Sequence, residues 1–253
     1  MDKNGKIGIF DSGIGGVTVL RELIKILPKE NYKYYSDSKN NPYGDKTEEE
    51  IKQRCCDIVE QLLQENCKVI VIACNTASAK AVKYLREQYP KISFIAIEPA
   101  YKMVYDYAYD KPTLVMATKG TVESEKFHLL LKKYNNHQTY VLPCVGLAET
   151  IEQGDKERIK SYLQKVIGEY KNRVQNVVLG CTHYPLVQEE ITEVLGQVQF
   201  FNGAPHLAKH LKHILEQQNL LNEKGQGMIE FEDSQTLPQK KNRFFEILKG
   251  EKK

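Results

Sequence analysis

The chain has 253 residues, of which 41% are hydrophobic and 27% are charged, and its formal net charge is +3. This is the composition of a globular protein with enough apolar residues for one large core or two small ones. The basic residues are spread along the chain, and no apolar stretch approaches the ~20 residues that cross a bilayer, so neither a nucleic-acid partner nor a membrane partner is expected.

Short apolar, β-branched runs alternate with amphipathic helical patterns along the chain. Apolar positions recur at helical spacing in Val17, Leu20 and Leu23, and a capping box at Thr47 and Glu50 opens a second helix. Several of the runs between helices are apolar throughout, as in parallel strands covered on both faces. The alternation predicts an α/β fold with largely parallel sheets. The expected strands lie at 7–10, 32–36, 69–73, 94–97, 113–117, 139–142, 177–180 and 198–201.

The strand–helix scheme of the first half is repeated in the second half, with no long linker between them. We therefore expect two similar α/β domains with the active site in the cleft between them, and residues 98–207 are expected to form the second. Near the end of the chain, a strand candidate at 228–231 and a helix candidate containing Phe244 and Leu248 are expected to pack against the rest of the protein.

Three loops that follow predicted strands carry polar residues, at 11–16, 74–78 and 181–185. Ligands in α/β sheets bind at the carboxyl ends of strands. In the last two loops a buried strand ends in a small residue, followed by Cys74 or Cys181 and then by a predicted helix start. That position is expected to lower a thiol pKa from about 8.5 to roughly 3.5–7.5, and its free amides suit a substrate carboxylate. One such cysteine is more often a core residue, whereas two in matching contexts indicate a shared function.

Paired cysteines of this kind suit the inversion of an α-carbon. Inversion requires a base on one face and an acid on the other, and a thiol–thiolate pair can exchange these roles. The sequence therefore predicts an amino acid racemase in which Cys74 and Cys181 act on opposite faces, without a cofactor. A single cysteine nucleophile for hydrolysis or acyl transfer stays an alternative, but it leaves the other cysteine without a role.

The loop at 11–16 resembles a phosphate-binding loop only superficially. Gly13-x-Gly15-x-x-Thr18 lacks the third glycine of a dinucleotide fingerprint, so a nucleotide cofactor is disfavoured. We expect these glycines to allow a tight turn that exposes Asp11 and Ser12. Position alone leaves Asp11 open to two interpretations, as a cap of the next helix or as a catalytic group.

Six cysteines stand in the sequence, and none belongs to a Cys-x-x-Cys pair. The amino terminus leads into a strand-like run without a signal region, so a cytoplasmic protein with reduced thiols is expected. No metal site is expected. His206, His210 and His213 are spaced along one predicted helix face, for which exposure to solvent is the favoured interpretation.

Taken together, the motifs resemble those of the glutamate racemases, in the aspartate/glutamate racemase superfamily. They stand here as IGIFDSGIGGVTVLREL, DSKNNPYGDK, VIACNTASA and LGCTHYPL, in family order over residues 7–188. The resemblance implies cofactor-independent interconversion of L- and D-glutamate, which supplies D-glutamate for peptidoglycan. It also implies that the chain returns to its first domain, which would contain 1–97 and about 208–253, and a homodimer is a further expectation.

The resemblance also implies roles for individual residues. Cys74 and Cys181 would be the two bases, with Asp11 close to the first and His183 close to the second. Glu152 would match a family acidic residue near the first cysteine, within PCVGLAETIEQGD where CPLFVPLVEEG is more usual. The residues expected to hold the amino acid are Ser12, Tyr43, Gly44, Asn75, Thr76 and Thr182.

Two further alternatives stay open at this point. The substrate could be another acidic amino acid such as aspartate, because the sequence does not give the size of the pocket. The chain could also be a non-catalytic binding protein of the same fold, although both cysteines are present.

Overall fold

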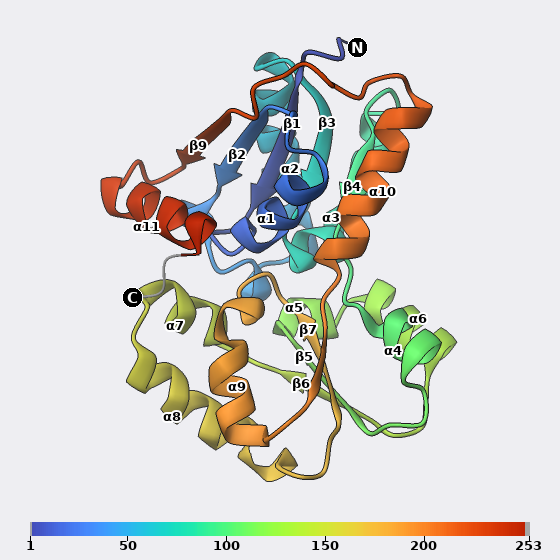
Figure 1. Cartoon of the computed structure of the whole chain (residues 1–253), viewed down its shortest axis with the longest axis vertical. Helices are drawn as coiled ribbons and strands as arrows, with labels where there is room; N and C mark the ends of the chain where they lie inside the picture. Colours follow the sequence, from blue (N-terminus) through green and yellow to red (C-terminus); the bar gives the residue numbers. More distant parts are fainter. Residues whose placement is uncertain (1, 251–253) are drawn as a thin grey trace.

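Residues 2–250 are described by a computed structural model, in which two parallel sheets are each packed between helices (Figure 1). The strand order is β4-β3-β1-β2-β9 in the first sheet and β6-β5-β7-β8 in the second. Every strand pair between described residues is parallel. The predicted α/β class with parallel sheets is therefore confirmed.

The first sheet and its helices are called the first body below. Its strands are β1 (Lys6–Asp11), β2 (Tyr32–Ser36), β3 (Cys67–Ile72), β4 (Phe94–Ala96) and β9 (Ile229–Asp233). One face packs against α1 (Val17–Ile26), α10 (Ala204–Gln217) and α11 (Pro238–Lys249), and the other against α2 (Glu48–Gln64) and α3 (Asn75–Gln88).

The second sheet and its helices are called the second body. Its strands are β5 (Thr113–Ala117), β6 (Thr139–Pro143), β7 (Asn176–Gly180) and β8 (Gln199–Phe201). One face packs against α7 (Leu147–Gln153), α8 (Lys156–Ile167) and α9 (Gln188–Leu195). The other packs against α4 (Tyr101–Tyr107) and α6 (Glu125–Tyr134), beside the short α5 (Lys119–Val122). The described part of the chain also contains four 3₁₀ turns, η1 (Ser38–Asn40), η2 (Tyr43–Asp45), η3 (Gly168–Tyr170) and η4 (Tyr184–Val187).

Burial on both faces explains why the strands read as continuous apolar runs. In β1, Ile7 and Ile9 belong to the core beneath α1 and α10, whereas Phe10 belongs to the core beneath α2 and α3. In β3, Val71 and Ile72 divide between the same two cores. Successive residues of a strand point to opposite faces, so each apolar position removes surface from water.

Local sequence patterns predicted the bounds of several elements correctly. The strands expected at 32–36 and 113–117 have those bounds, and the other strands shift by a residue or two. The capping box of α2 is confirmed, because Thr47 Oγ1 accepts from the Glu50 amide at 3.2 Å while Glu50 Oε2 accepts from the Thr47 amide at 2.8 Å. The last segment packs as expected, with β9 paired to β2 and the Phe244 ring 4.7 Å from that of Tyr34. Within residues 2–250, we find no helix with the length and apolar character of a membrane span.

Candidate active site

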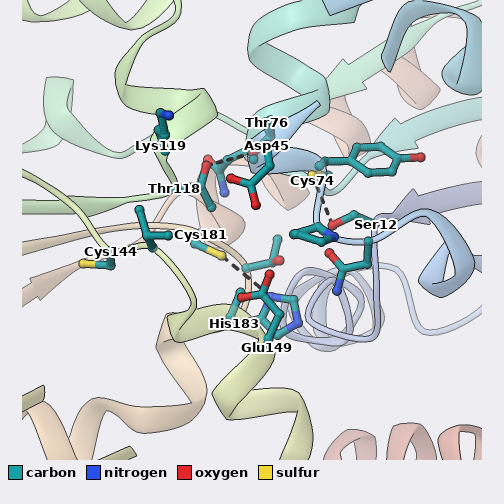
Figure 2. Close-up of a pocket in the computed structure, with 18 of the residues that line it drawn as sticks. Ser12, Asp45, Cys74, Thr76, Thr118, Lys119, Cys144, Glu149, Cys181 and His183 are labelled. Atoms are coloured by element: carbon teal, nitrogen blue, oxygen red, sulfur yellow. Dashed lines mark hydrogen bonds between the residues drawn. The ribbon is translucent and has the colours of Figure 1, made fainter. Parts of the chain in front are cut away.

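A cavity lies where loops at the strand ends of the two bodies meet (Figure 2). The expectation that polar residues following the strands converge on one site is met, since loops after β1, β3, β5, β6 and β7 all contribute. Residues 11–12, 41–45, 74–76, 118–119, 144–146, 148–149 and 181–183 line the cavity.

The cavity brings together all but one of the site residues expected from the sequence. Glu152 does not line it and lies behind His183. The lining residues expected from the sequence are Asp11, Ser12, Tyr43, Gly44, Cys74, Asn75, Thr76, Cys181, Thr182 and His183.

Six polar or thiol side chains of the cavity were not anticipated, namely Asn41, Asp45, Thr118, Lys119, Cys144 and Glu149. Thr118 directly follows β5, so the strand-end rule that selected the two cysteines would also have selected it. In Figure 2 the sulfur of Cys144 is directed away from Cys181, and its thiol donates to the carbonyl of Leu142 at 3.7 Å.

Cys74 caps the amino terminus of α3 and is 5% exposed. Its sulfur accepts from the Ala77 amide at 3.5 Å, and its thiol donates to Ser12 Oγ at 3.7 Å. Burial nevertheless raises the pKa of Cys74 to about 12, with a further contribution from the Asp11 carboxylate. The expected lowering of this thiol pKa is therefore wrong, because desolvation and a nearby negative charge outweigh the helix amides.

Cys181 has a different environment. Its sulfur lies 3.7 Å from His183 Nδ1, and His183 Nε2 lies 2.9 Å from Glu152 Oε1. Burial lowers the pKa of His183, but its bonds to Cys181 and Glu152 outweigh that effect and raise the pKa well above its usual value. The ring is therefore protonated at neutral pH and donates on both sides.

The segment after Cys181 also differs from the expected helix start. A 3₁₀ turn, η4, follows with His183 at its N-cap, and α9 begins only at Gln188. Pro185 lies in the first positions of η4 and has no amide hydrogen to offer. Where the sulfur of Cys74 accepts from a helix amide, the sulfur of Cys181 lies against the His183 ring.

Glu152 lies beside the second cysteine, not the first, which corrects the expectation from the sequence. Besides His183, its Oε1 accepts from the Ile14 amide at 2.9 Å, and Lys240 Nζ lies 3.7 Å from its Oε2. Burial raises the pKa of Glu152, but the His183 bond and these further contacts lower it to a net value below normal. The Glu152 carboxylate thus orients the His183 ring and favours its protonated form.

The glycines at 13 and 15 permit a close approach between the two bodies. A Cβ on Gly13 would lie 1.9 Å from Glu152 Oε1, and one on Gly15 would lie 2.4 Å from His183 Nδ1. Neither glycine has a positive φ. Glycine is therefore required at these positions by the close contact with the second body, and not by a left-handed backbone conformation. The loop does not expose Asp11, which is fully buried and accepts from the Gly16 amide at 2.7 Å.

Two buried oxygen atoms at the cavity lack a hydrogen-bond partner among the described residues, Asp11 Oδ1 and Asn75 Oδ1. The other carboxylate oxygen of Asp11 accepts from Gly16 and from Thr182 Oγ1, the latter at 3.2 Å. Buried polar atoms are nearly always paired in folded proteins. These two acceptors therefore mark where a ligand with N–H donors would bind.

The cavity is closed by hydrogen bonds between the bodies. Thr18 Oγ1 donates to the carbonyl of Thr182 at 2.9 Å on one side, and the hydroxyls of Thr76 and Thr118 are 2.8 Å apart on the other. The cavity volume is about 50 Å³, well below the roughly 300 Å³ at which ligand pockets begin. The structure is thus a closed form of the site.

A family model described as Asp/Glu/Hydantoin racemase matches residues 12–211. The chain belongs to this racemase family, and the expectation of an amino acid racemase, an isomerase, is confirmed. The chain is 44% identical to a glutamate racemase of Clostridium perfringens over 226 residues, which is 87% of each chain. The resemblance to glutamate racemases is likewise confirmed.

Solved structures agree with this assignment. A glutamate racemase isoform of Bacillus anthracis superposes with a TM-score of 0.85 at 29% identity, covering 98% of this chain and 95% of that one. The Francisella tularensis glutamate racemase in complex with D-glutamate gives a TM-score of 0.82 at 29% identity, covering 97% and 94%.

Proposed function

We propose that this chain is a glutamate racemase that interconverts L- and D-glutamate without a cofactor, using two thiols as acid and base. The observation that carries the proposal is a pair of buried cysteines, one from each body, at one closed cavity. Figure 2 draws Cys74 and Cys181 on opposing sides of that cavity. Similarity to glutamate racemases over most of the chain supports glutamate as the substrate.

The cavity offers partners for each charged group of an amino acid. Asp11 Oδ1 and Asn75 Oδ1 are unpaired acceptors suited to the ammonium group. The amino terminus of α3 at Thr76, together with the nearby Thr118 hydroxyl and Gly44, offers donors for a carboxylate. We also assign Ser12, Tyr43 and Thr182 to substrate binding.

Racemization then needs one proton to leave and one to arrive. A thiolate removes the α-proton, and the electron pair of the broken C–H bond is delocalised into the α-carboxylate. The opposite thiol donates its proton to the other face of the carbon, so that thiol and thiolate have exchanged places after one turnover. Asp11 lies beside Cys74 and His183 beside Cys181, where each can assist its sulfur.

The two thiols have unequal surroundings in the closed, unliganded site. Because burial raises the pKa of Cys74 to about 12, that sulfur carries its proton at neutral pH. His183 Nδ1 lies 3.7 Å from the other sulfur, that of Cys181. Since Cys74 carries its proton, we assign it as the acid, and Cys181 as the base, for the enantiomer whose α-proton faces Cys181.

Substrate access requires the two bodies to separate, because the closed cavity is too small for glutamate. We propose that they correspond to two domains, 1–97 with about 208–253, and 98–207. Strand membership supports this division, since β9 joins the first sheet and β5 to β8 form the second. Opening would break the Thr18–Thr182 and Thr76–Thr118 hydrogen bonds.

Circular dichroism of purified protein with L- or D-glutamate, and no added cofactor, tests the function. Optical activity should decay to zero from either enantiomer, and recovered glutamate should carry deuterium at Cα when the solvent is D₂O. Cys74→Ser and Cys181→Ser should each abolish racemization, whereas Cys144→Ser, at the third cysteine of the cavity, should retain most of it. Unchanged optical activity with the unmodified chain refutes the proposal.

The same assay separates the rival functions. Faster turnover of aspartate than of glutamate would reassign the substrate, and a covalent adduct at one cysteine without deuterium exchange would indicate nucleophilic catalysis. Each Cys→Ser variant should still eliminate a leaving group from one enantiomer of a β-substituted glutamate, with opposite preferences. The cytoplasmic location, the peptidoglycan role and a homodimer stay predictions, and light scattering of purified protein tests the last.

A further inference from the structure

The loop after β2 carries a buried hydrogen-bond network that the steps above do not use. Asp37 directly follows β2 and is fully buried. Its Oδ2 accepts from Tyr43 Oη at 2.6 Å and from Arg54 Nε at 2.9 Å. Its Oδ1 accepts from Arg54 Nη2 at 3.2 Å and from Asn40 Nδ2 at 3.0 Å. Arg54 extends from α2, so three segments of the first body meet at this carboxylate.

Tyr43 connects this network to the cavity. It begins η2, a turn that lines the cavity, and its side chain is 1% exposed. Its hydroxyl is bonded to Asp37, which does not line the cavity, so this end of the ring is directed away from the substrate space. Gly44 follows and has no side chain, so the turn presents main chain to the cavity at that point.

On its other side the same turn abuts the second body. A Cβ on Gly120 would lie 3.0 Å from the carbonyl oxygen of Gly44 and 3.2 Å from its Cα. The turn is therefore held between Asp37 and α5, with little room to shift when the site closes. A displacement of about 1 Å in a substrate-binding element can cost roughly a hundredfold in rate.

We propose that Asp37 and Arg54 are positioning residues that fix the Tyr43–Asp45 turn for binding of a substrate carboxylate, an inference that rests on the proposed function. A bidentate arginine sets the orientation of a carboxylate as well as balancing its charge. The Arg54 and Tyr43 bonds hold the pKa of Asp37 below normal although burial raises it. The group therefore remains a charged acceptor for the tyrosine hydroxyl.

Tyr43→Phe is the least disruptive test, because it removes only the hydroxyl that joins the turn to Asp37. We expect KM to rise roughly tenfold for both enantiomers, as for loss of one hydrogen bond to a charged group, while kcat changes little. Arg54→Met should raise KM at least as much. Arg54→Lys should raise KM less than Arg54→Met, because lysine keeps the positive charge but lacks the planar guanidinium that donates two hydrogen bonds to one carboxylate. Thermal unfolding of each variant reports whether the fold is intact.

Asp57→Asn is the matched control. Asp57 is half exposed and accepts from Arg54 Nη1 at 3.1 Å, on the side away from Asp37, so its loss should leave KM unchanged. A merely structural role would reduce the active fraction and thus kcat, with KM unaltered. An unchanged KM in folded Tyr43→Phe overturns the positioning role alone. Absence of turnover by the unmodified chain overturns the proposed function, and this inference with it.

Discussion

Gly15→Ala should block closure of the site without unfolding the protein. The added Cβ would lie 2.4 Å from His183 Nδ1, and the ring cannot easily yield because it is held by Cys181 and Glu152. Gly15 belongs to the first body and His183 to the second, so the clash exists only when the two meet. Separation of the bodies relieves it at little cost to either core.

The size of the effect follows from the geometry. A contact of 3.4 Å is the lower limit of ordinary van der Waals packing for a Cβ, so the loop and the ring must move apart by about 1 Å. Misplacement on that scale lowers catalytic rates by roughly a hundredfold. We therefore expect kcat to fall about a hundredfold in both directions, and the midpoint of thermal unfolding to change by only a few degrees.

Two other glycines provide the comparison. A Cβ on Gly168 would meet only the flexible end of Gln164, so Gly168→Ala should behave like the unmodified chain. A Cβ on Gly16 would meet Ala73 Cβ at 2.9 Å and Asp11 Cβ at 3.0 Å within the first body, so Gly16→Ala should lower stability itself. Polarimetry and calorimetry on all three variants separate the effects. Full activity in Gly15→Ala would refute the inference that catalysis requires this closed form.

Three further predictions concern charge. Glu152→Gln removes a carboxylate that helps to raise the pKa of His183, so the alkaline limb of the kcat–pH profile should move to lower pH; a profile that only loses amplitude would contradict this. In the unmodified chain the same raised pKa stabilises the fold fully below about pH 6.5, and that contribution is lost as pH rises through the folded value. Lys68→Met should cost about 3–5 kcal/mol in urea unfolding, because it leaves the Glu30 carboxylate buried without its 2.6 Å partner. Lys25→Met, at an exposed pair, should change stability little, and equal losses in the two variants would refute the argument.

The fold class was predictable because its signal is local. Apolar runs such as that of β3 report burial on both faces through residue type alone, and the capping box of α2 is contained within four residues. The strand-end rule then located Cys74 and Cys181 without any knowledge of how the sheets are oriented. The order of strands in each sheet was not predictable in this way, because it depends on pairings between distant segments.

The parts of the site that were missed depend on contacts between the bodies. Glu152 was expected at the first cysteine, but α7 of the second body places it at His183. The glycines at 13 and 15 looked like turn residues, and only the facing side chains reveal why no Cβ fits there. The pKa of Cys74 was expected to fall at a helix terminus, but burial depth, which a motif does not encode, raises it to about 12.

The two cysteine motifs are alike in sequence, yet their surroundings are electrostatically opposite. Cys74 has neutral hydrogen-bond partners in Ala77 and Ser12 and lies near the Asp11 carboxylate, whereas Cys181 lies against a histidine that Glu152 keeps charged. A two-base reaction requires one sulfur with a proton and one without at the start of each turnover. Equal environments would not determine which sulfur carries the proton, and a site with both thiols protonated would have no base. The His183–Glu152 pair lies beside Cys181 and not beside Cys74, so the two faces of a bound substrate would meet different electrostatic surroundings. The two directions are therefore expected to differ in kcat and KM individually, while their ratios kcat/KM remain equal because the equilibrium between enantiomers is unity.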